Sequence, residues 1–339
     1  TVDVVGLDTL VHVANGIYEN CPEDEELEVF KLPKFINTLM ENNWLGSKSG
    51  QGFYKKIKGE NGKNTILGLD LETLEYRKGK KANFPTLELT KSVDLVIDRF
   101  KILVAGKDKA GEFYRKSFAL MFAYVSKRIP EISEEFYKID DAMKAGFGWE
   151  NGPYEIWDAI GVEKGIELMK EVGKEPATWV TDMLASGIKS FYIVKNGATY
   201  YYDIIQKKHI KVPGQDSFII LNNIRKSKEV FKNSGCVVED LGEGILNVEF
   251  QSKMNTIGGD VLAGLNKAID IAEKSFSGLV VGNQGTNFSV GANIGMIFMM
   301  AVEQEYDELN MAIKYFQDTV MRLRYSSIPT VVAPQGMTL

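Results

Sequence analysis

The sequence predicts a mostly α-helical region that is followed by an α/β domain. Over the first half of the chain, apolar residues recur at helical spacing between corners rich in Gly and Pro, as in Lys138–Glu163. A hairpin follows, because two β-rich runs flank Asn196-Gly197, the strongest short turn signal. After Pro213, strand-like runs alternate with a helix, and this alternation indicates an α/β domain that begins near residues 210–240.

The same spacing places the expected elements in order. Residues 57–87 interrupt the helices, because two Gly-containing turns and short β-like fragments predict a hairpin connector there. The expected helices lie at 2–18, 32–44, between 89 and 128 with a break at 106–108, and then at 129–146, from about 154, at 176–186, at 258–276 and from about 294. The strand-like runs of the α/β domain lie at 217–224, 236–242, 244–250 and 278–285.

Composition and charge exclude several classes of protein. The chain has 339 residues, of which 44% are hydrophobic and 25% are charged, as in ordinary globular proteins. Its net charge of -6 argues against a nucleic-acid or anionic-membrane surface, since such a surface needs a basic stripe. No run reaches ~18 apolar residues, so no membrane span is expected.

Cysteine and histidine are scarce. Cys21 and Cys236 lie far apart, and His12 and His209 are the two histidines of the sequence. This set has no metal-ligand or redox spacing, so we expect no metal and a reducing, cytoplasmic compartment. We interpret His12 as a helix residue and His209 as a loop residue, neither of them catalytic.

The two ends of the chain predict a piece of a longer polypeptide. Thr1-Val2-Asp3 enters an apolar helix pattern directly, without an initiator Met, a cap or a signal peptide. At the other end, PQGMTL stops just after the strand-like VVAP, where a turn would be expected to continue.

Two stretches of the chain repeat one pattern. Thr1–Asp8 aligns with Ile156–Glu163 through an Asp, an apolar residue, a Gly and a second apolar residue in the same order. Further on, residues 32–54 parallel residues 175–192, each with a Pro, a helix, a corner and a terminal Phe-Tyr. The shared order predicts a tandem duplication of one helical unit.

Single residues of this unit have structural interpretations. The glycines of GFGWENGP make a tight corner between two helices rather than a cradle for a ligand. Trp149 and Trp157 are expected to anchor the core. Asp3 and Asp158 are expected to cap or pair locally.

These strings resemble a known family. AYVSKRIPEI, YKIDDAMKAGFGWENGPYEIWDAIGV, VDVVGLDTL and WLGSKSGQGFYKK are similar to the C-terminal helical domains of 3-hydroxyacyl-CoA dehydrogenases, which occur in tandem in multifunctional β-oxidation enzymes. The resemblance covers roughly residues 1–56 and 100–192. It implies NAD as the cofactor and a helical domain that closes over the acyl-CoA substrate. The family's nicotinamide-binding glycines and catalytic His–Glu pair belong to a preceding Rossmann domain, and no G-x-G-x-x-G follows a strand here.

The second informative stretch covers residues 278–305. A buried strand, Leu279–Val281, leads through a Gly/Asn turn and a loop into an apolar helix near Ile294. Free N–H groups at the start of a helix, together with the positive end of its dipole, favour developing negative charge. This arrangement suits an oxyanion hole for a thioester enolate. Gly291 would let the backbone approach the ligand closely.

The context of this stretch brings a second resemblance. NVEFQSKMNTIGGDVLAGLNKAI, FSGLVVGNQGTNFSVGANI and SIPTVVAPQGMTL, in that order, resemble the first half of an enoyl-CoA hydratase (crotonase) domain, over about residues 244–339. By analogy, the backbone N–H of Ala292 is one oxyanion donor, while the second donor and the catalytic glutamates belong to segments after Leu339. Asn293 replaces the Asp common in this loop. The resemblance assigns acyl-CoA binding to Met254, Asn255, Phe288, Ser289, Val290 and Gly291.

Other side chains near this loop have plainer interpretations. Glu303 and Glu305 are expected on a solvent-exposed face. Met296, Met299 and Met300 are expected in the core, with an acyl pocket as the alternative, since Met side chains suit either. The strands of the crotonase-like part are expected to leave an unpaired edge.

Together the resemblances define the expected fold class: tandem 3-hydroxyacyl-CoA dehydrogenase C-terminal helical domains followed by an α/β crotonase-like half domain. The expected divisions are a first helical domain at 1–56, a hairpin-containing connector at 57–98, a second helical domain at 99–192, a hairpin and linker at 193–240, and the crotonase-like part at 241–339.

The expected function is that of a central piece of a fused 3-hydroxyacyl-CoA dehydrogenase and enoyl-CoA hydratase of fatty-acid β-oxidation. Its substrate would be an acyl-CoA, a homo-oligomer is possible, and the piece alone is expected to be inactive. One alternative is a non-catalytic helical assembly module with a degenerate crotonase half. Another is a stand-alone short-chain hydroxybutyryl-CoA dehydrogenase, although that family lacks the tandem copy and the crotonase tail.

Overall fold

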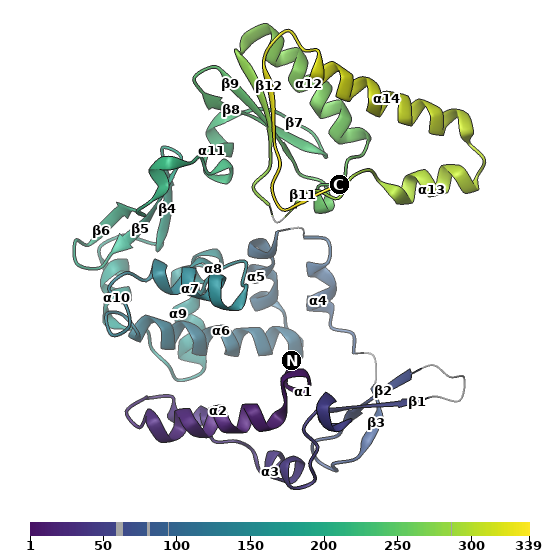
Figure 1. Cartoon of the computed structure of the whole chain (residues 1–339). Helices are drawn as coiled ribbons and strands as arrows, with labels where there is room; N and C mark the ends of the chain where they lie inside the picture. Colours follow the sequence, from purple (N-terminus) through teal and green to yellow (C-terminus); the bar gives the residue numbers. More distant parts are fainter. Residues whose placement is uncertain (59–63, 80–81, 94, 286) are drawn as a thin grey trace. The chain divides into compact units, whose positions relative to one another are not determined.

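The computed structural model describes residues 1–58, 64–79, 82–93, 95–285 and 287–339. The chain divides into two compact units, Thr1–Leu89 with Gly106–Ala110 and Thr90–Ala105 with Gly111–Leu339. Figure 1 gives the order of the elements along the chain. Among the described residues, no helix is both long enough and apolar enough to cross a membrane.

The first unit combines short helices with a small sheet. Leu7, Ile36 and Leu39 form the buried centre of its core. The three strands pair antiparallel in the order β1-β2-β3. The predicted turn of this hairpin falls on residues 59–63, which lie outside the described residues. The elements are α1 (Val2–Val5), α2 (Leu7–Asn20), a 3₁₀ turn (Leu27–Phe30), α3 (Lys34–Glu41), a second 3₁₀ turn (Ser47–Ser49), β1 (Tyr54–Lys58), β2 (Asn64–Leu69), β3 (Tyr76–Lys78) and α4 (Pro85–Thr90).

The second unit begins with a helical region and a three-stranded sheet. Its core is aromatic: Trp157 is fully buried and stacks on Phe122 with ring centroids 4.8 Å apart. The predicted hairpin at Asn196-Gly197 is present, and both turn residues have positive φ. The elements are α5 (Val96–Ala105), α6 (Lys109–Lys127), α7 (Tyr137–Phe147), α8 (Pro153–Ile160), α9 (Val162–Glu171), α10 (Thr178–Ala185), β4 (Tyr192–Lys195), β5 (Ala198–Asp203) and β6 (Lys208–Lys211).

The two copies of the repeated pattern have the same local geometry. The helix predicted at 2–18 is broken at Gly6, where φ is 115°, and the corresponding Gly161 has φ 106° and separates α8 from α9. An L-residue rarely adopts this conformation, so each glycine allows the chain to turn between two helices.

Asp3 and Asp158 occupy equivalent positions in the two copies. The carboxylate of Asp3 accepts hydrogen bonds from the backbone N–H groups of Phe53 at 2.9 Å and Tyr54 at 2.7 Å. In the second copy, Asp158 accepts the same pair of bonds from Phe191 and Tyr192, both at 2.7 Å. The expectation that these aspartates pair locally was wrong, because each one joins a helix to the start of a strand that is distant in the sequence.

Two further segments differ from the predicted secondary structure. The helix predicted at 129–146 begins only at Tyr137, after a run of turns that contains a cis Ile129-Pro130 peptide bond. Residues 217–224, predicted as a strand, contribute to helix α11 (Leu221–Lys228). Leu221 is buried, and Arg225 on the next turn reaches Glu239 and Glu249, so tertiary contacts decide the conformation of this segment.

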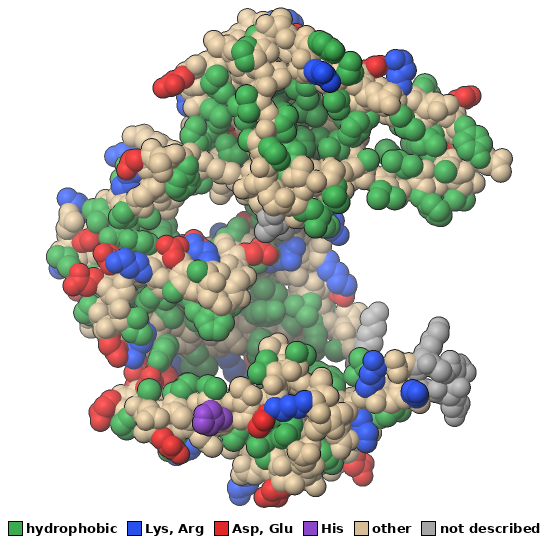
Figure 2. All heavy atoms as spheres, in the orientation of Figure 1, with side chains coloured by type: hydrophobic (Ala, Val, Ile, Leu, Met, Phe, Trp, Pro, Cys, Tyr) green, Lys and Arg blue, Asp and Glu red, His purple; other side chains and the backbone are tan. Residues whose placement is uncertain are grey.

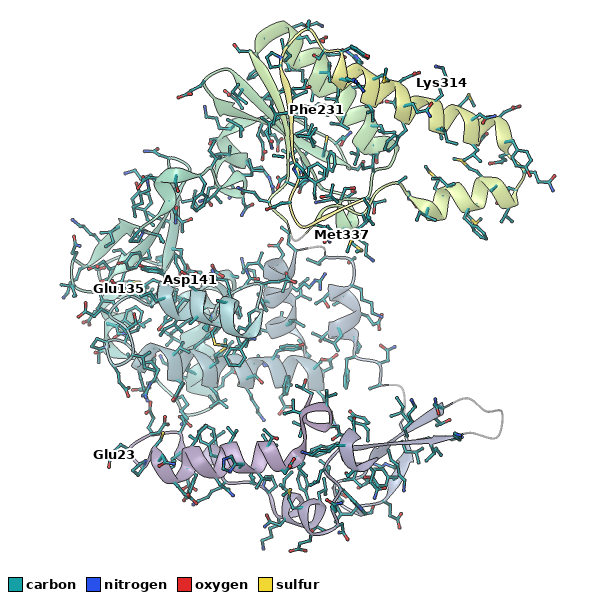
Figure 3. The ribbon with its side chains drawn as sticks, in the orientation of Figure 1. Glu23, Glu135, Asp141, Phe231, Lys314 and Met337 are labelled. Carbon is teal, nitrogen blue, oxygen red and sulfur yellow. The ribbon has the colours of Figure 1, made fainter. Side chains whose placement is uncertain are left out.

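The last part of the second unit is an α/β region. Its five-stranded sheet has the order β12-β10-β9-β8-β7, in which β12, β10 and β9 are parallel and β9, β8 and β7 are antiparallel. A separate parallel pair joins β11 to β13, and Met337 marks this pair in Figure 3. The remaining elements are β7 (Glu229–Lys232), β8 (Cys236–Gly242), β9 (Ile245–Phe250), α12 (Gly259–Ser275), β10 (Gly278–Gly282), β11 (Asn287–Ser289), α13 (Ile294–Val302), α14 (Tyr306–Arg324), β12 (Thr330–Ala333) and β13 (Met337–Thr338).

Helix α12 covers one face of this sheet. Val261, Leu265 and Ile269 pack with strand residues into one buried core. On its other side α12 is joined to α14, where Arg322 binds Asp270 and Asn266 donates to Thr319 at 2.8 Å. The predicted fold class, a mostly helical region followed by an α/β region, is confirmed.

Helix α13 is apolar but exposed. Ile294 is 75% exposed and Phe298 is 63% exposed, and Figure 2 shows hydrophobic side chains gathered on the surface of this helix. The expectation that Met296 and Met299 lie in the core was wrong, because both side chains are exposed. Among the described residues, the two edge strands of the five-stranded sheet are β12 and β7, each paired with one neighbour.

Candidate functional site

The candidate site is the loop that connects β11 to α13. Gly291 has φ 81°, a left-handed conformation that turns the chain from the strand toward the helix. Asn293 then caps α13, because its side-chain oxygen accepts a hydrogen bond from the Met296 N–H at 3.2 Å. Asn293 is therefore the residue at which the helix begins.

A second segment, which contributes Asn255 and Ile257, is hydrogen-bonded to this loop. The side-chain amide of Asn255 donates to the Asn287 carbonyl at 2.9 Å, and the Ile257 N–H donates to the Gly291 carbonyl at 2.8 Å. The Ser289 hydroxyl donates to the Asn255 carbonyl at 2.7 Å and accepts from the Gly291 N–H at 2.9 Å. Two pieces of chain that are separated by all of α12 and β10 thus form one bonded structure.

An apolar cavity of about 320 Å³ lies beside these segments. Ala292 and Ile257 line it on the side of the loop. The other lining residues come from the start of α12 and from the facing sides of α13 and α14, and include Leu262, Met296, Ile297, Leu309, Ile313 and Phe316. A cavity of this size and polarity suits an acyl group or another apolar ligand.

The backbone N–H of Ala292 is available for a ligand. In the part of the chain that the structure describes, this N–H has no hydrogen-bond acceptor, because the bridge between Ala292 and Ile257 is made by the neighbouring groups. A backbone N–H that has no acceptor within the protein can donate to an incoming oxygen.

The other predicted site residues have different surroundings. Phe288 is 7% exposed and packs on Phe250 in the core of the sheet, so it supports the loop rather than lining the cavity. Val290 is partly buried, and Met254 is 55% exposed with φ 56°. The structure therefore brings Asn255, Ser289, Gly291 and Ala292 together and leaves Met254 on the surface.

Asn283 supports the same loop and was not predicted. It is 5% exposed, its side-chain oxygen accepts from the Phe250 N–H at 2.6 Å, and its side-chain nitrogen donates to the Phe288 carbonyl at 2.7 Å. An Asn directly after a buried strand is the sequence signal that could have identified it.

The histidines and the remaining acidic residues give no second site. His209 lies on strand β6, not in a loop as predicted, and its Nε2 lies 3.0 Å from the Ser190 carbonyl. Glu303 and Glu305 are exposed in the turn between α13 and α14. Among the described residues, no three His, Cys, Asp or Glu side chains gather as a metal site would need.

A buried carboxylate lies in the helical region of the second unit. Asp140 has no exposed surface and accepts hydrogen bonds from the N–H groups of Tyr154 at 2.9 Å and Glu155 at 3.1 Å and from the Tyr192 hydroxyl at 2.8 Å. Gly152 is required beside it, because a Cβ there would lie 2.3 Å from the Asp140 side chain. The structural interpretation of this glycine is confirmed, as is that of Trp157, whereas Trp149 is 38% exposed and does not anchor the core.

The protonation of Asp140 should make stability depend on pH. Burial raises the pKa of Asp140 to about 7, because desolvation of the charged form outweighs its hydrogen bonds. Between pH ~4 and pH ~7 the folded state then holds a proton that the unfolded state releases. We expect the titration of Asp140 alone to lower the free energy of unfolding by roughly 3–4 kcal/mol as the pH rises through this range.

Urea unfolding at several pH values measures this dependence, with Asp140→Asn as the comparison. The variant should show a shallower decline, since it carries no titrating group at this position. A residual slope is expected, because burial also raises the pKa of Asp158 to about 7. A wild-type protein that gains stability as the pH rises from 4 to 7 would contradict the prediction.

A known domain family matches the first part of the chain. Residues 1–56 match the family described as the C-terminal domain of 3-hydroxyacyl-CoA dehydrogenase. The resemblance stated from the sequence is confirmed for these residues.

Relatives extend this similarity over the whole chain. The chain is 41% identical over 340 residues to a protein of Bacillus subtilis named "Probable 3-hydroxyacyl-CoA dehydrogenase", an alignment that covers 100% of this chain and 42% of the relative. It is 45% identical over 210 residues to a fatty acid oxidation complex subunit alpha of Psychrobacter sp. This alignment covers 56% of this chain and 24% of the relative. The chain thus spans less than half the length of either relative.

Solved structures are similar to part of the chain. An enoyl-CoA hydratase/isomerase of Xanthobacter autotrophicus aligns with 31% of this chain and 40% of its own length, with 24% sequence identity and a TM-score of 0.27.

Proposed function

We propose that this chain is a central part of a multifunctional enzyme of fatty-acid β-oxidation, in which 3-hydroxyacyl-CoA dehydrogenase and enoyl-CoA hydratase activities are fused. The observation that carries the proposal is the 41% identity, along the whole chain, to a protein named as a 3-hydroxyacyl-CoA dehydrogenase. The division into helical domains at 1–56 and 99–192, with a connector at 57–98, a linker at 193–240 and a crotonase-like part at 241–339, is part of this proposal.

The proposed hydration site uses the loop after β11. Water adds across the double bond of a trans-2-enoyl-CoA, and negative charge develops on the thioester oxygen as the enolate forms. The Ala292 N–H, which lacks an acceptor among the described residues, donates to this oxygen, and the apolar cavity beside it receives the acyl chain. The carboxylates that handle the proton and the water are not assigned to residues of this chain.

The proposed dehydrogenase step oxidises the 3-hydroxyl of the hydrated product with NAD. Each helical domain is proposed to close over the acyl-CoA as a rigid body. The aspartate bonds of both copies and the aromatic core of the second support this rigidity. No residue of this chain is proposed to bind NAD, because the sequence has no Gly-rich turn of the required spacing after a strand. We place the enzyme in the cytoplasm, with a homo-oligomer as its proposed assembly.

Two assays on the full polypeptide in which residues 1–339 occur test the proposal. The protein should oxidise NADH in the presence of acetoacetyl-CoA, and it should remove the enoyl absorbance of crotonyl-CoA. Loss of both activities would leave the non-catalytic assembly module as the better explanation. Dehydrogenase activity without hydration would show that the crotonase-like part is degenerate.

A further inference from the structure

The loop that carries Ala292 is fixed by a short relay of side-chain hydrogen bonds. Ser289 is at its centre and is 1% exposed. Its hydroxyl spans the two segments of the site, donating to the Asn255 carbonyl at 2.7 Å and accepting from the Gly291 N–H at 2.9 Å. A hydroxyl has one proton and two lone pairs, so both bonds form at the same time.

Asn255 completes the relay from the other segment. Its side-chain amide donates to the Asn287 carbonyl at 2.9 Å, and Asn287 lies two residues before Ser289 on the same strand. Its backbone φ of 55° lies in the left-handed region, which Asn tolerates better than most residues with a side chain. The backbone conformation turns the Asn255 carbonyl and side chain toward the same strand, and the relay holds that conformation.

The relay acts directly beside the Ala292 N–H. Two hydrogen bonds hold the backbone of Gly291. Its N–H donates to the Ser289 hydroxyl, and its carbonyl accepts from the Ile257 N–H at 2.8 Å. The peptide that joins Gly291 to Ala292 contains that carbonyl and the Ala292 N–H, and a trans peptide is planar. Fixing the Gly291 carbonyl therefore fixes the direction of the Ala292 N–H.

We propose that Ser289 and Asn255 are positioning residues for hydration, which hold the Ala292 N–H in the direction that the thioester oxygen requires. The inference rests on the proposed function and adds to it two residues that do not touch the reacting atoms. Preorganised donors are effective because they need no rearrangement when charge develops. Without the relay, the donor should still be present but poorly directed.

Steady-state hydration of crotonyl-CoA by the full polypeptide tests the proposal. Ser289→Ala should lower kcat about 10- to 100-fold, as expected for a misplaced catalytic group, while KM changes less than about threefold. Ser289→Thr, which keeps the hydroxyl, should recover most of the lost kcat. Asn255→Gly, which keeps the left-handed backbone but removes the amide donor, should resemble Ser289→Ala.

Thr256→Ala is the matched control. The Thr256 hydroxyl also donates to a backbone carbonyl, that of Lys253 at 2.8 Å, but this bond stays within its own segment and does not reach β11. Its kcat should therefore equal that of the wild type. A drop in kcat as large as that of Ser289→Ala would overturn the inference, because the loss of any hydroxyl near the loop would then have the same effect.

Hydrogen exchange of the Gly291 amide, whose N–H donates to the Ser289 hydroxyl at 2.9 Å, gives a readout independent of activity. Ser289→Ala should accelerate exchange there and leave exchange in β9 and β10 unchanged. Unchanged exchange, or an unchanged kcat in an active enzyme, would overturn the positioning role of Ser289 and Asn255 while the proposed function stands. If the wild type hydrates no crotonyl-CoA, the proposed hydration fails, and exchange alone then decides whether the relay fixes this loop. Global acceleration would show a folding defect and would also count against a local positioning role.

Discussion

Replacing Ala292 by proline should lower the kcat for enoyl-CoA hydration about 100- to 1000-fold, the usual effect of removing one donor from an oxyanion hole. Proline has no backbone N–H, so the substitution deletes the proposed donor and keeps an apolar side chain at the cavity wall. The existing bridge to Ile257 should remain, since it is formed through the Gly291 carbonyl and not through the Ala292 N–H.

Ala292→Gly is the control for this substitution. It keeps the N–H and removes a single methyl group, so its kcat should stay within a few-fold of the wild type. NADH oxidation with acetoacetyl-CoA should be unaffected in both variants, and thermal unfolding shows whether each is folded. Equal kcat values for enoyl-CoA hydration in the proline and glycine variants would exclude the Ala292 N–H as an oxyanion donor.

Replacing Asp158 by alanine should destabilise the helical region of the second unit by roughly 2–4 kcal/mol. The Asp158 carboxylate accepts hydrogen bonds from the N–H groups of Phe191 and Tyr192, and Phe191 has no exposed surface. Alanine leaves both N–H groups without their acceptor, at about 1–3 kcal/mol for each buried group. The substitution should also weaken the hydrogen bonding of Asp140, because the Tyr192 hydroxyl is one of the donors to the Asp140 carboxylate.

The first copy of the repeat provides an internal comparison. Asp3→Ala removes the same pair of bonds. Tyr54 is 62% exposed, however, so water can accept the hydrogen bond of its N–H in place of the carboxylate. We expect a smaller destabilisation there, roughly 1–2 kcal/mol. Urea unfolding, with hydrogen exchange at 53–54 and 191–192, measures the two effects separately. Equal stability of Asp158→Ala and the wild type would show that these bonds contribute little to stability.

The sequence predicted the elements with strong local signals. The Asn196-Gly197 hairpin, the helix over residues 258–276 and the strands at 236–242 and 244–250 follow from turn residues and apolar spacing that the structure satisfies locally. The segment 217–224 was predicted wrongly, because its apolar residues suit a strand while Arg225, one turn later, finds buried glutamates on β8 and β9. Nothing local in the sequence contains that information.

The candidate site shows the same limit. Gly291 could be found from the strand–turn–helix pattern, since the chemistry of a helix start is local. Ala292 was named from the resemblance to the crotonase loop. The role of Ser289 could not be found in either way, because its partner Asn255 belongs to a segment on the other side of α12. The repeated aspartates were recognised as a pattern, but their bonds to Phe53-Tyr54 and Phe191-Tyr192 required the fold.

The pairing of β11 with β13 also bears on the order in which the site forms during synthesis. The Ser289 carbonyl accepts from the Leu339 N–H at 3.1 Å, and the Phe288 N–H donates to the Gln335 carbonyl at 3.0 Å. These partners are translated only after the whole α13–α14 hairpin, and contacts between distant segments form late because a long loop must close first. On the ribosome, β9, α12 and β10 can pack together while the loop before α13 still lacks its neighbouring strand. The proposed oxyanion donor should therefore become ordered only after β13 has left the exit tunnel.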